Sequence, residues 1–218
     1  MATIETIKAR LPNGNEAQAE LFYDQYATSP RGQYDNLGTI LISPHKAHWV
    51  TSRDDAVDTS IPLGNSPYEH WDNLRREQLN LKKSDIAIAY PITKHEHGGE
   101  ISLSLGGKSG GCWDHDVLGF IYITKEQLRT WYDTKRITKS IIEQGKNRLQ
   151  AELDLLTAWL NDDCCGWQVK EYALTDDGLE WEEVGVLESC WGYFDQAQAS
   201  CDMKDMLKRL TKNQPEEV

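Results

Sequence analysis

The chain of 218 residues lacks the long apolar segments of a membrane or secreted protein. No apolar run approaches the roughly 20 residues that span a bilayer. The first stretch, MATIETIKARLPNGNEAQ, has no apolar core of the kind a signal peptide needs. The five cysteines are an odd number, and Cys164 and Cys165 are adjacent, whereas secreted disulfide frameworks usually have an even, spaced set. We therefore expect reduced thiols and a cytoplasmic location.

Positive charge is also scarce. The chain has 23 Lys and Arg against 35 Asp and Glu, a formal net charge of −12. Nucleic acids and anionic membranes attract positive charge, so we expect no direct binding to either, while a basic protein partner remains compatible. Hydrophobic residues make up 39%, and the eight Trp and nine Tyr favour a packed core over a solvated tail.

The order of the expected elements predicts the fold class. Strands and helices are intermixed, and hairpins replace regular strand–helix–strand repeats, so we predict α+β with a largely antiparallel sheet. The pattern predicts a single domain over residues 1–212, packed by a long helix at about 138–160 and a C-terminal helix, and a disordered tail over 213–218. The expected strands are 39–43, 85–91, 100–105, 117–123, 167–174 and 181–187, and the expected helices are 16–26, 66–79, 124–132, 138–160 and 196–210.

Acidic residues concentrate in residues 150–192, which hold eleven acids and one base, Lys170. This stretch has a net charge of −10, and residues 124–149 just before it have +4. Such an asymmetry creates a strong local field. One interpretation is a surface that imitates a nucleic-acid backbone and binds a host protein with a basic nucleic-acid-binding groove. The other is a solvated face. The candidate partner-binding residues are Asp162, Asp163, Glu171, Asp176, Asp177, Glu180, Glu182, Glu183 and Glu188.

Several side chains near the middle of the chain could bind a metal. His95 and His97 are two residues apart, and CWDHD adds Cys112, Asp114, His115 and Asp116. Histidine, cysteine and carboxylate suit zinc or another divalent ion. The spacing matches no established signature, and loop histidines are often only solvated. We expect no cofactor, and a divalent metal stays an open alternative.

Two other catalytic patterns are weak. LGGKSGG (residues 105–111) resembles a phosphate-binding loop, but Ser102 stands where the first glycine of that motif is required. Cys112 could be a nucleophile with His115 or His95 as base, although a cysteine beside tryptophan is more often a buried small residue. We therefore lean against an enzyme.

A set of motifs resembles a widespread family of uncharacterised proteins from phages and other mobile elements. The motifs are YDNLGTILI (34–42), EISLSL (100–105), GCWDHDVLGFIYITKEQLR (111–129), RITKS (136–140) and ESCWGYFD (188–195). The sequence departs from the family at Gly111, where proline is usual, and at residues 115–118, which replace a Ser-Gly-Gln-Val pattern. The resemblance implies an accessory gene of a mobile element, acting in the host cytoplasm.

In that context the first hypothesis is an inhibitor of a host defence, a CRISPR or restriction complex, that acts by binding through the acidic residues. The second is a small metal- or Cys-dependent enzyme centred on His95, His97, Cys112, Asp114 and His115. The third is a structural or regulatory phage protein. The segments that carry the resemblance could also meet at one pocket, formed by Asp35, Asn36, Trp113, Asp114 and Trp191. Equally, Asp35 and Asn36 could close a loop and the tryptophans could be core.

Overall fold

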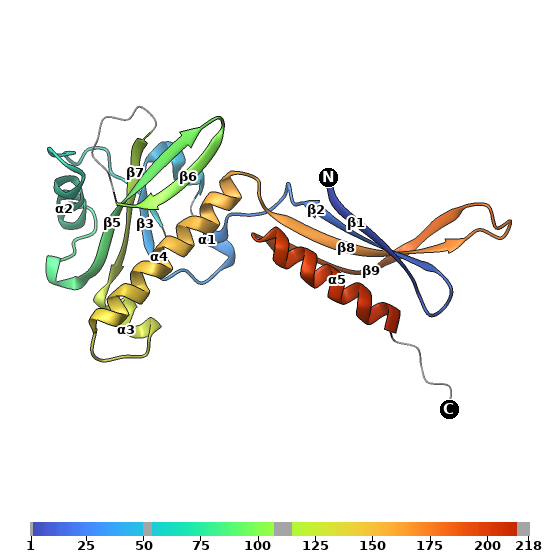
Figure 1. Ribbon diagram of the computed structural model, residues 1–218. Helices are drawn as coiled ribbons and strands as arrows, with labels where there is room; N and C mark the ends of the chain where they lie inside the picture. Colours follow the sequence, from blue (N-terminus) through green and yellow to red (C-terminus); the bar gives the residue numbers. More distant parts are fainter. Residues whose placement is uncertain (1, 50–53, 107–114, 213–218) are drawn as a thin grey trace. The chain divides into compact units, whose positions relative to one another are not determined.

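The computed structural model describes residues 2–49, 54–106 and 115–212, and it confirms the α+β class with antiparallel sheets (Figure 1). The chain divides into two compact units. We call Met1–Ala27 with Asp162–Val218 the terminal unit, and Thr28–Asn161 the central unit. Each has its own sheet and its own apolar core. A single folding domain over residues 1–212 stays a prediction.

The terminal unit contains a four-stranded antiparallel sheet in the order β1-β2-β8-β9. Its strands are β1 (Thr3–Arg10), β2 (Glu16–Tyr23), β8 (Cys165–Leu174) and β9 (Trp181–Tyr193). The expected helix at 16–26 is wrong, because this segment forms β2. Ala17, Ala19 and Leu21 are fully buried at every second position, which is the period of a strand with one covered face.

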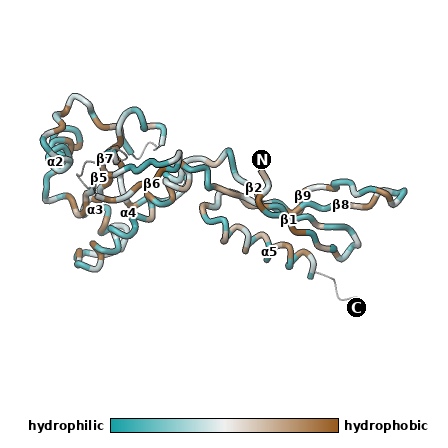
Figure 2. The backbone as a smooth tube through the Cα atoms, turned by 45° about the horizontal axis from the view of Figure 1, so that its top comes forward, coloured by the Kyte–Doolittle hydropathy of each residue, from teal (hydrophilic) through white to brown (hydrophobic). Residues whose placement is uncertain are grey.

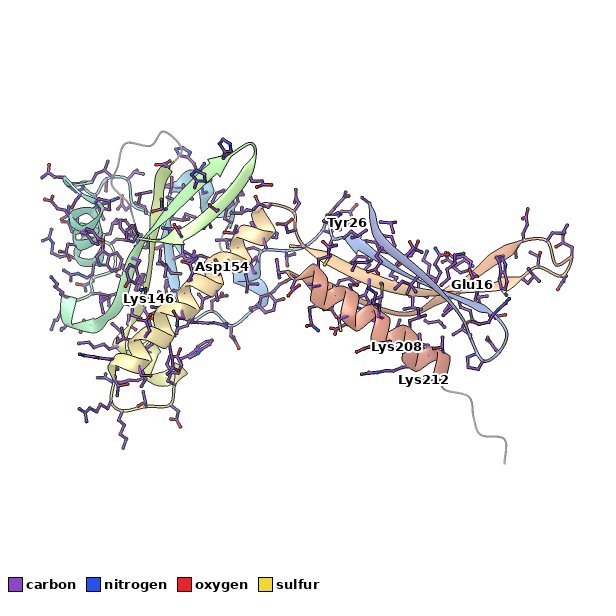
Figure 3. All side chains as sticks on the ribbon, in the orientation of Figure 1. Glu16, Tyr26, Lys146, Asp154, Lys208 and Lys212 are labelled. Atoms are coloured by element: carbon purple, nitrogen blue, oxygen red, sulfur yellow. The ribbon has the colours of Figure 1, made fainter. Side chains whose placement is uncertain are left out.

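Helix α5 (Gln196–Lys212) covers that buried face of the sheet (Figure 1). Its buried residues Ala199, Met203 and Leu207 recur every four positions. Its polar face carries Lys208 and Lys212 near the C-terminal end (Figure 3). Hydrophobic and hydrophilic residues alternate along the helix (Figure 2). The C-terminal helix expected at 196–210 is thus confirmed.

Three polar side chains join α5 to the sheet. The hydroxyl of Tyr193 donates to Oδ2 of Asp202 at 3.0 Å and accepts from Nε1 of Trp167 at 3.3 Å. Buried polar groups cost free energy unless they are paired, and these bonds pair the Trp167 indole and the Tyr193 hydroxyl.

The central unit is inserted between two neighbouring strands of the terminal sheet. β2 pairs directly with β8, and Tyr23 lies opposite Cys165 at the end of the pairing. The backbone N–H of Asp24 then donates to the carbonyl of Cys164 at 2.8 Å. The chain therefore leaves and re-enters the terminal unit at adjacent backbone positions.

The central unit contains a five-stranded sheet in the order β4-β3-β7-β5-β6. All its pairings are antiparallel except β3 with β4. The apolar segment expected to form a central strand does so as β7. The strands are β3 (Thr39–Ile42), β4 (Asp55–Ala56), β5 (Ile86–His97), β6 (Glu100–Leu105) and β7 (His115–Thr124).

Helices cover both faces of this sheet (Figure 1). On one face α4 (Lys139–Leu160) packs with Leu149, Leu153 and Leu156. On the other, Leu74 of α2 (Pro67–Glu77) packs with Phe120 and Tyr122. The remaining helices are α1 (Pro30–Gln33), α3 (Lys125–Trp131) and the 3-10 turns η1 (Pro44–Trp49) and η2 (Lys83–Asp85).

The helix starts follow the expected capping chemistry. The Ser66 hydroxyl accepts from the backbone N–H of Glu69, with Pro67 in the first helical turn. At α3, Thr124 and Gln127 form the reciprocal capping box. Among the described residues, no helix has the length and apolarity to cross a membrane.

Candidate acidic interaction surface

The two units differ sharply in charge. The terminal unit has eighteen acids and seven bases, a net charge of −11. The central unit has seventeen acids and sixteen bases, a net charge of −1. Nearly all of the chain's excess charge therefore belongs to one folded unit.

Within the terminal unit the charge is densest in a hairpin formed by the end of β8, the turn that follows, and β9. We call residues 170–188 the acidic hairpin. Its end extends past α5 (Figure 1), and the residues at its tip are exposed. It contains seven acids and Lys170, a net charge of −6.

Three carboxylates of the acidic hairpin have partners that fix their positions. Glu171 accepts hydrogen bonds at 2.7 Å from the side-chain amides of Asn15 and Asn13. These bonds lower the pKa of Glu171, that from Asn15 most strongly. Glu183 accepts from Nζ of Lys170 at 2.8 Å, which raises the pKa of the lysine.

At the turn, Asp177 accepts from the hydroxyl of Thr175 at 2.5 Å and from the backbone N–H of Leu179 at 3.1 Å. The Thr175 bond contributes most to lowering the pKa of Asp177. Gly178 has a φ of +71°, a conformation that favours glycine, as expected for the turn. Asp177 therefore holds the turn that positions the tip.

The other carboxylates of the acidic hairpin make no side-chain hydrogen bond or ion pair within the described part of the chain, and all are exposed. They are Asp176, Glu180, Glu182 and Glu188. These four can engage a partner without first breaking an internal bond. The hairpin thus separates carboxylates that hold its shape from carboxylates that face solvent.

Asp162 and Asp163 lie at the opposite end of β8 and are exposed. Their negative charges act on the neighbouring thiol of Cys164. Burial first, and then the charges of Asp24, Asp162 and Asp163, raise the pKa of Cys164 to about 12. This thiol stays protonated at neutral pH and is a poor nucleophile.

The charge density of the acidic hairpin can be compared with that of nucleic acid. Its first arm, from Lys170 to Asp177, is eight residues long, or about 26 Å at ~3.3 Å per residue. Six net charges over that length give one charge per ~4 Å, against one per ~1.7 Å of duplex DNA and ~3.4 Å of one strand. The acidic hairpin therefore approximates a single strand and falls well short of a duplex.

The acids outside the hairpin do not extend this surface across the sheet. On the face opposite α5, Lys8 pairs with Glu16 at 2.7 Å, and Lys170 pairs with Glu183. The same face carries Trp191, which stacks on Phe22 with ring centroids 6.3 Å apart. This part of the sheet is charge-balanced.

The residues proposed to form a pocket belong to different units of the chain. Asp35 and Asn36 belong to the central unit, whereas Trp191 belongs to the terminal unit. Trp113 and Asp114 lie outside the described residues. Asn36 is buried, and its amide donates to the carbonyls of Tyr34 at 2.7 Å and Arg31 at 3.2 Å. These bonds close the loop.

The loop of Asn36 surrounds a buried ion cluster that the sequence did not indicate. Arg31 donates twice to Asp54, at 2.6 and 2.9 Å, and once to Glu152 at 2.8 Å. Glu152 also accepts from the backbone N–H groups of Leu37 at 2.6 Å and Gly38 at 3.2 Å. The three charged side chains are at most 1% exposed. The motif YDNLGT thus supplies backbone partners to this cluster.

The metal hypothesis gains nothing from the described residues. The rings of His95 and His97 stack with centroids 6.4 Å apart, and the strand register places His95 opposite His115. Across residues 2–49, 54–106 and 115–212, no three His, Cys, Asp or Glu side chains gather as a metal site. Cys112, Asp114 and the side chain of His115 fall outside the description.

No family model matches this chain, and neither a curated protein nor a solved structure is similar to it.

Proposed function

We propose that the protein is a phage or mobile-element accessory protein that inhibits a host-defence complex, of CRISPR or restriction type, in the host cytoplasm. The acidic hairpin acts by occupying a basic groove that normally holds nucleic acid. The observation that carries the proposal is the charge partition: −11 on the terminal unit against −1 on the central unit.

The arrangement of carboxylates favours binding over chemistry. Asp176, Glu180, Glu182 and Glu188 are exposed, and the bonds to Glu171, Glu183 and Asp177 hold the hairpin that presents them. The charge spacing near that of one strand favours a groove for single-stranded nucleic acid.

The edge strand of the terminal sheet favours a partner that recognises its side chains rather than its backbone. β9 is an edge strand, and its pairing with β8 has three register shifts, between Cys165 and Trp167, Val169 and Lys170, and Glu171 and Tyr172. Bulges and charges at an edge oppose the addition of another strand. The partner is therefore expected to contact carboxylates rather than extend the sheet.

The test removes charge from the four solvent-facing carboxylates in one variant, Asp176→Asn, Glu180→Gln, Glu182→Gln and Glu188→Gln. A matched control removes the same charge from exposed acids of the central unit, through Glu77→Gln, Glu100→Gln, Glu126→Gln and Glu143→Gln. Both variants have the same net charge, so only the location of the lost carboxylates differs.

Each protein is immobilised and exposed to host lysate at low and high salt, with and without single-stranded oligonucleotide. We expect the wild type and the control to retain a nucleic-acid-binding protein, and the oligonucleotide to displace it. The hairpin variant should lose it. For an identified partner, four lost ion contacts lower the salt slope of binding by roughly 3, at ~0.7 per contact with a single strand.

The proposal is contradicted if the hairpin variant still retains the nucleic-acid-binding protein, or if the oligonucleotide does not displace that protein from the wild type. A second readout is phage plating on cells that carry a defence system. Expression of the wild type and the control, but not of the hairpin variant, should restore plating.

A further inference from the structure

A cleft in the central unit lies outside everything assigned above. It has a volume of about 530 Å³, within the range of small-molecule sites. Its floor is the sheet at Val117–Phe120 of β7 together with Ser43 and Pro44, which follow β3, and one wall is the loop that leads into α2. His70 of α2 also lines it.

The lining of the cleft, as far as the structure describes it, carries no charged side chain. Of its fifteen residues none is Asp, Glu, Lys or Arg, although charged residues make up 27% of the chain. The start of α2 adds no anion site, because Ser66 caps Glu69 and the Glu69 carboxylate accepts from the backbone N–H of Asn65 at 2.8 Å. Among the described residues a phosphate or carboxylate would find no countercharge in this cleft, so the described lining disfavours nucleotides and acids as ligands.

The rim of the cleft is apolar. The side chains of Leu63 and Val117 are among the large hydrophobic groups exposed to solvent, at 69% and 40%. Burying such groups is favourable in proportion to the apolar area removed from water. An apolar ligand body therefore fits the cleft.

One polar group of the cleft lacks a partner. Nε2 of His70 is shielded from solvent and makes no hydrogen bond in the described structure. The ring lies edge-on to Phe120, with centroids 5.4 Å apart. Burial lowers the pKa of His70, so the imidazole is neutral at physiological pH.

A neutral imidazole carries its proton on one nitrogen. An unpaired buried N–H is rarer than an unpaired buried acceptor, which favours the proton on Nδ1. Nδ1 is then the donor that the ring can offer to a molecule in the cleft.

We propose that this cleft binds a small, uncharged, mainly apolar molecule whose carbonyl oxygen accepts a hydrogen bond from Nδ1 of His70. The site belongs to the central unit and uses none of the acidic-hairpin residues. It is therefore a binding activity separate from the proposed inhibition, and each can fail without the other.

The test uses two probes of one shape, 2-acetylnaphthalene and 2-isopropenylnaphthalene, which differ by a carbonyl oxygen in place of a methylene. Binding is followed by NMR through the methyl groups of Val57, Ile61 and Val117, which line the cleft. The carbonyl probe should bind wild type about three- to tenfold more tightly, the worth of one hydrogen bond. The anionic 2-naphthoate should bind more weakly than both.

In His70→Phe the ring packing against Phe120 is kept and the donor is lost. The two probes should then bind equally, whereas His97→Phe, a change at an exposed histidine of β5, should behave as wild type. Val117→Trp fills the cleft and should weaken both probes. Thermal unfolding verifies that each variant is folded.

Two results overturn the proposal of a cleft ligand: no binding of either probe to wild type, or shifts that map away from the cleft. Equal binding of the two probes to wild type overturns the role of His70. Binding of 2-naphthoate as tight as that of the carbonyl probe overturns the uncharged class.

Discussion

Replacement of Arg31 by methionine should destabilise the central unit strongly. The guanidinium makes two bonds to Asp54, one to Glu152 and one to the carbonyl of Gly38 at 2.7 Å, all within a site closed to solvent. Its loss leaves Asp54 without the cation that it pairs with, and leaves Glu152 only the longer contact of 3.4 Å between its Oε1 and Nε of Arg148. Breaking a buried ion pair by removing one partner costs about 3–5 kcal/mol. At an m-value of ~2 kcal/mol per M, the urea midpoint should fall by roughly 2 M.

The loss should also depend on pH. Burial raises the pKa of Glu152 above its ordinary value, and the charge of Arg31 opposes that rise. Without Arg31 the pKa of Glu152 rises further, so the folded variant holds this proton more tightly than the unfolded chain does. Stability of the variant therefore falls as the pH rises above the ordinary pKa of glutamate, and it falls further than that of wild type once the pH passes the raised pKa of Glu152 in the folded wild type. The deficit should shrink in acid, where Glu152 is protonated.

The assay is urea unfolding at several pH values, with amide hydrogen exchange along α4 to report on the central unit by itself. The matched control is Arg76→Met, because Arg76 is an exposed arginine whose contacts, an ion pair with Glu77 and a hydrogen bond to Asn73, lie at the surface. Exposed pairs contribute ~0–1 kcal/mol. The double variant Arg31→Met, Glu152→Gln should recover part of the loss. A deficit no larger than that of the control, or one that is constant with pH, refutes the reasoning.

Two further predictions concern the terminal unit. A Cβ on Gly166 would lie 2.2 Å from Cε3 of Trp191, so Gly166→Ala should lower the free energy of unfolding by about 1–3 kcal/mol. The control is Gly185→Ala on the neighbouring strand, where a Cβ would meet nothing within 4 Å, and it should change the free energy of unfolding by no more than ~0.5 kcal/mol. Equal losses in the two variants contradict the packing of Gly166 against Trp191. Deletion of residues 28–161, with a short linker from Ala27 to Asp162, should leave a folded terminal unit with the circular dichroism of four strands and one helix, since β2 and β8 already pair where the chain is cut. An unfolded product would instead support the single domain predicted from the sequence.

Local chemistry explains which parts of the fold were predictable. The strand at 117–123, the capped helices from Ser66, Thr124 and Thr138, and the helix at 196–210 all follow from short-range patterns, and the structure contains each of them. The helix predicted at 16–26 is a strand in the structure, although its sequence EAQAELFY is rich in residues that favour helices. Pairing with β1 and β8 overrides that preference.

The candidate sites divide in the same way. The concentration of acids in residues 150–192 was visible in the sequence, but its boundary was not. Glu152 belongs to that stretch yet lies buried beside Arg31, whereas Glu180 and Glu182 are exposed. No pattern of residue types distinguishes these carboxylates, since burial depends on neighbours far along the chain.

By itself, the sequence determined the acidity, the α+β class and the capped helices, because composition and contacts within a few residues decide them. Only the tertiary structure decided that the chain forms two units, that one of them holds −11 of the charge, and which carboxylates face solvent. It also decided that His70 lines an uncharged cleft and that Arg31 meets Glu152. Arg31 and Glu152, for example, are 121 positions apart, and pairing and packing at that distance leave no local signature.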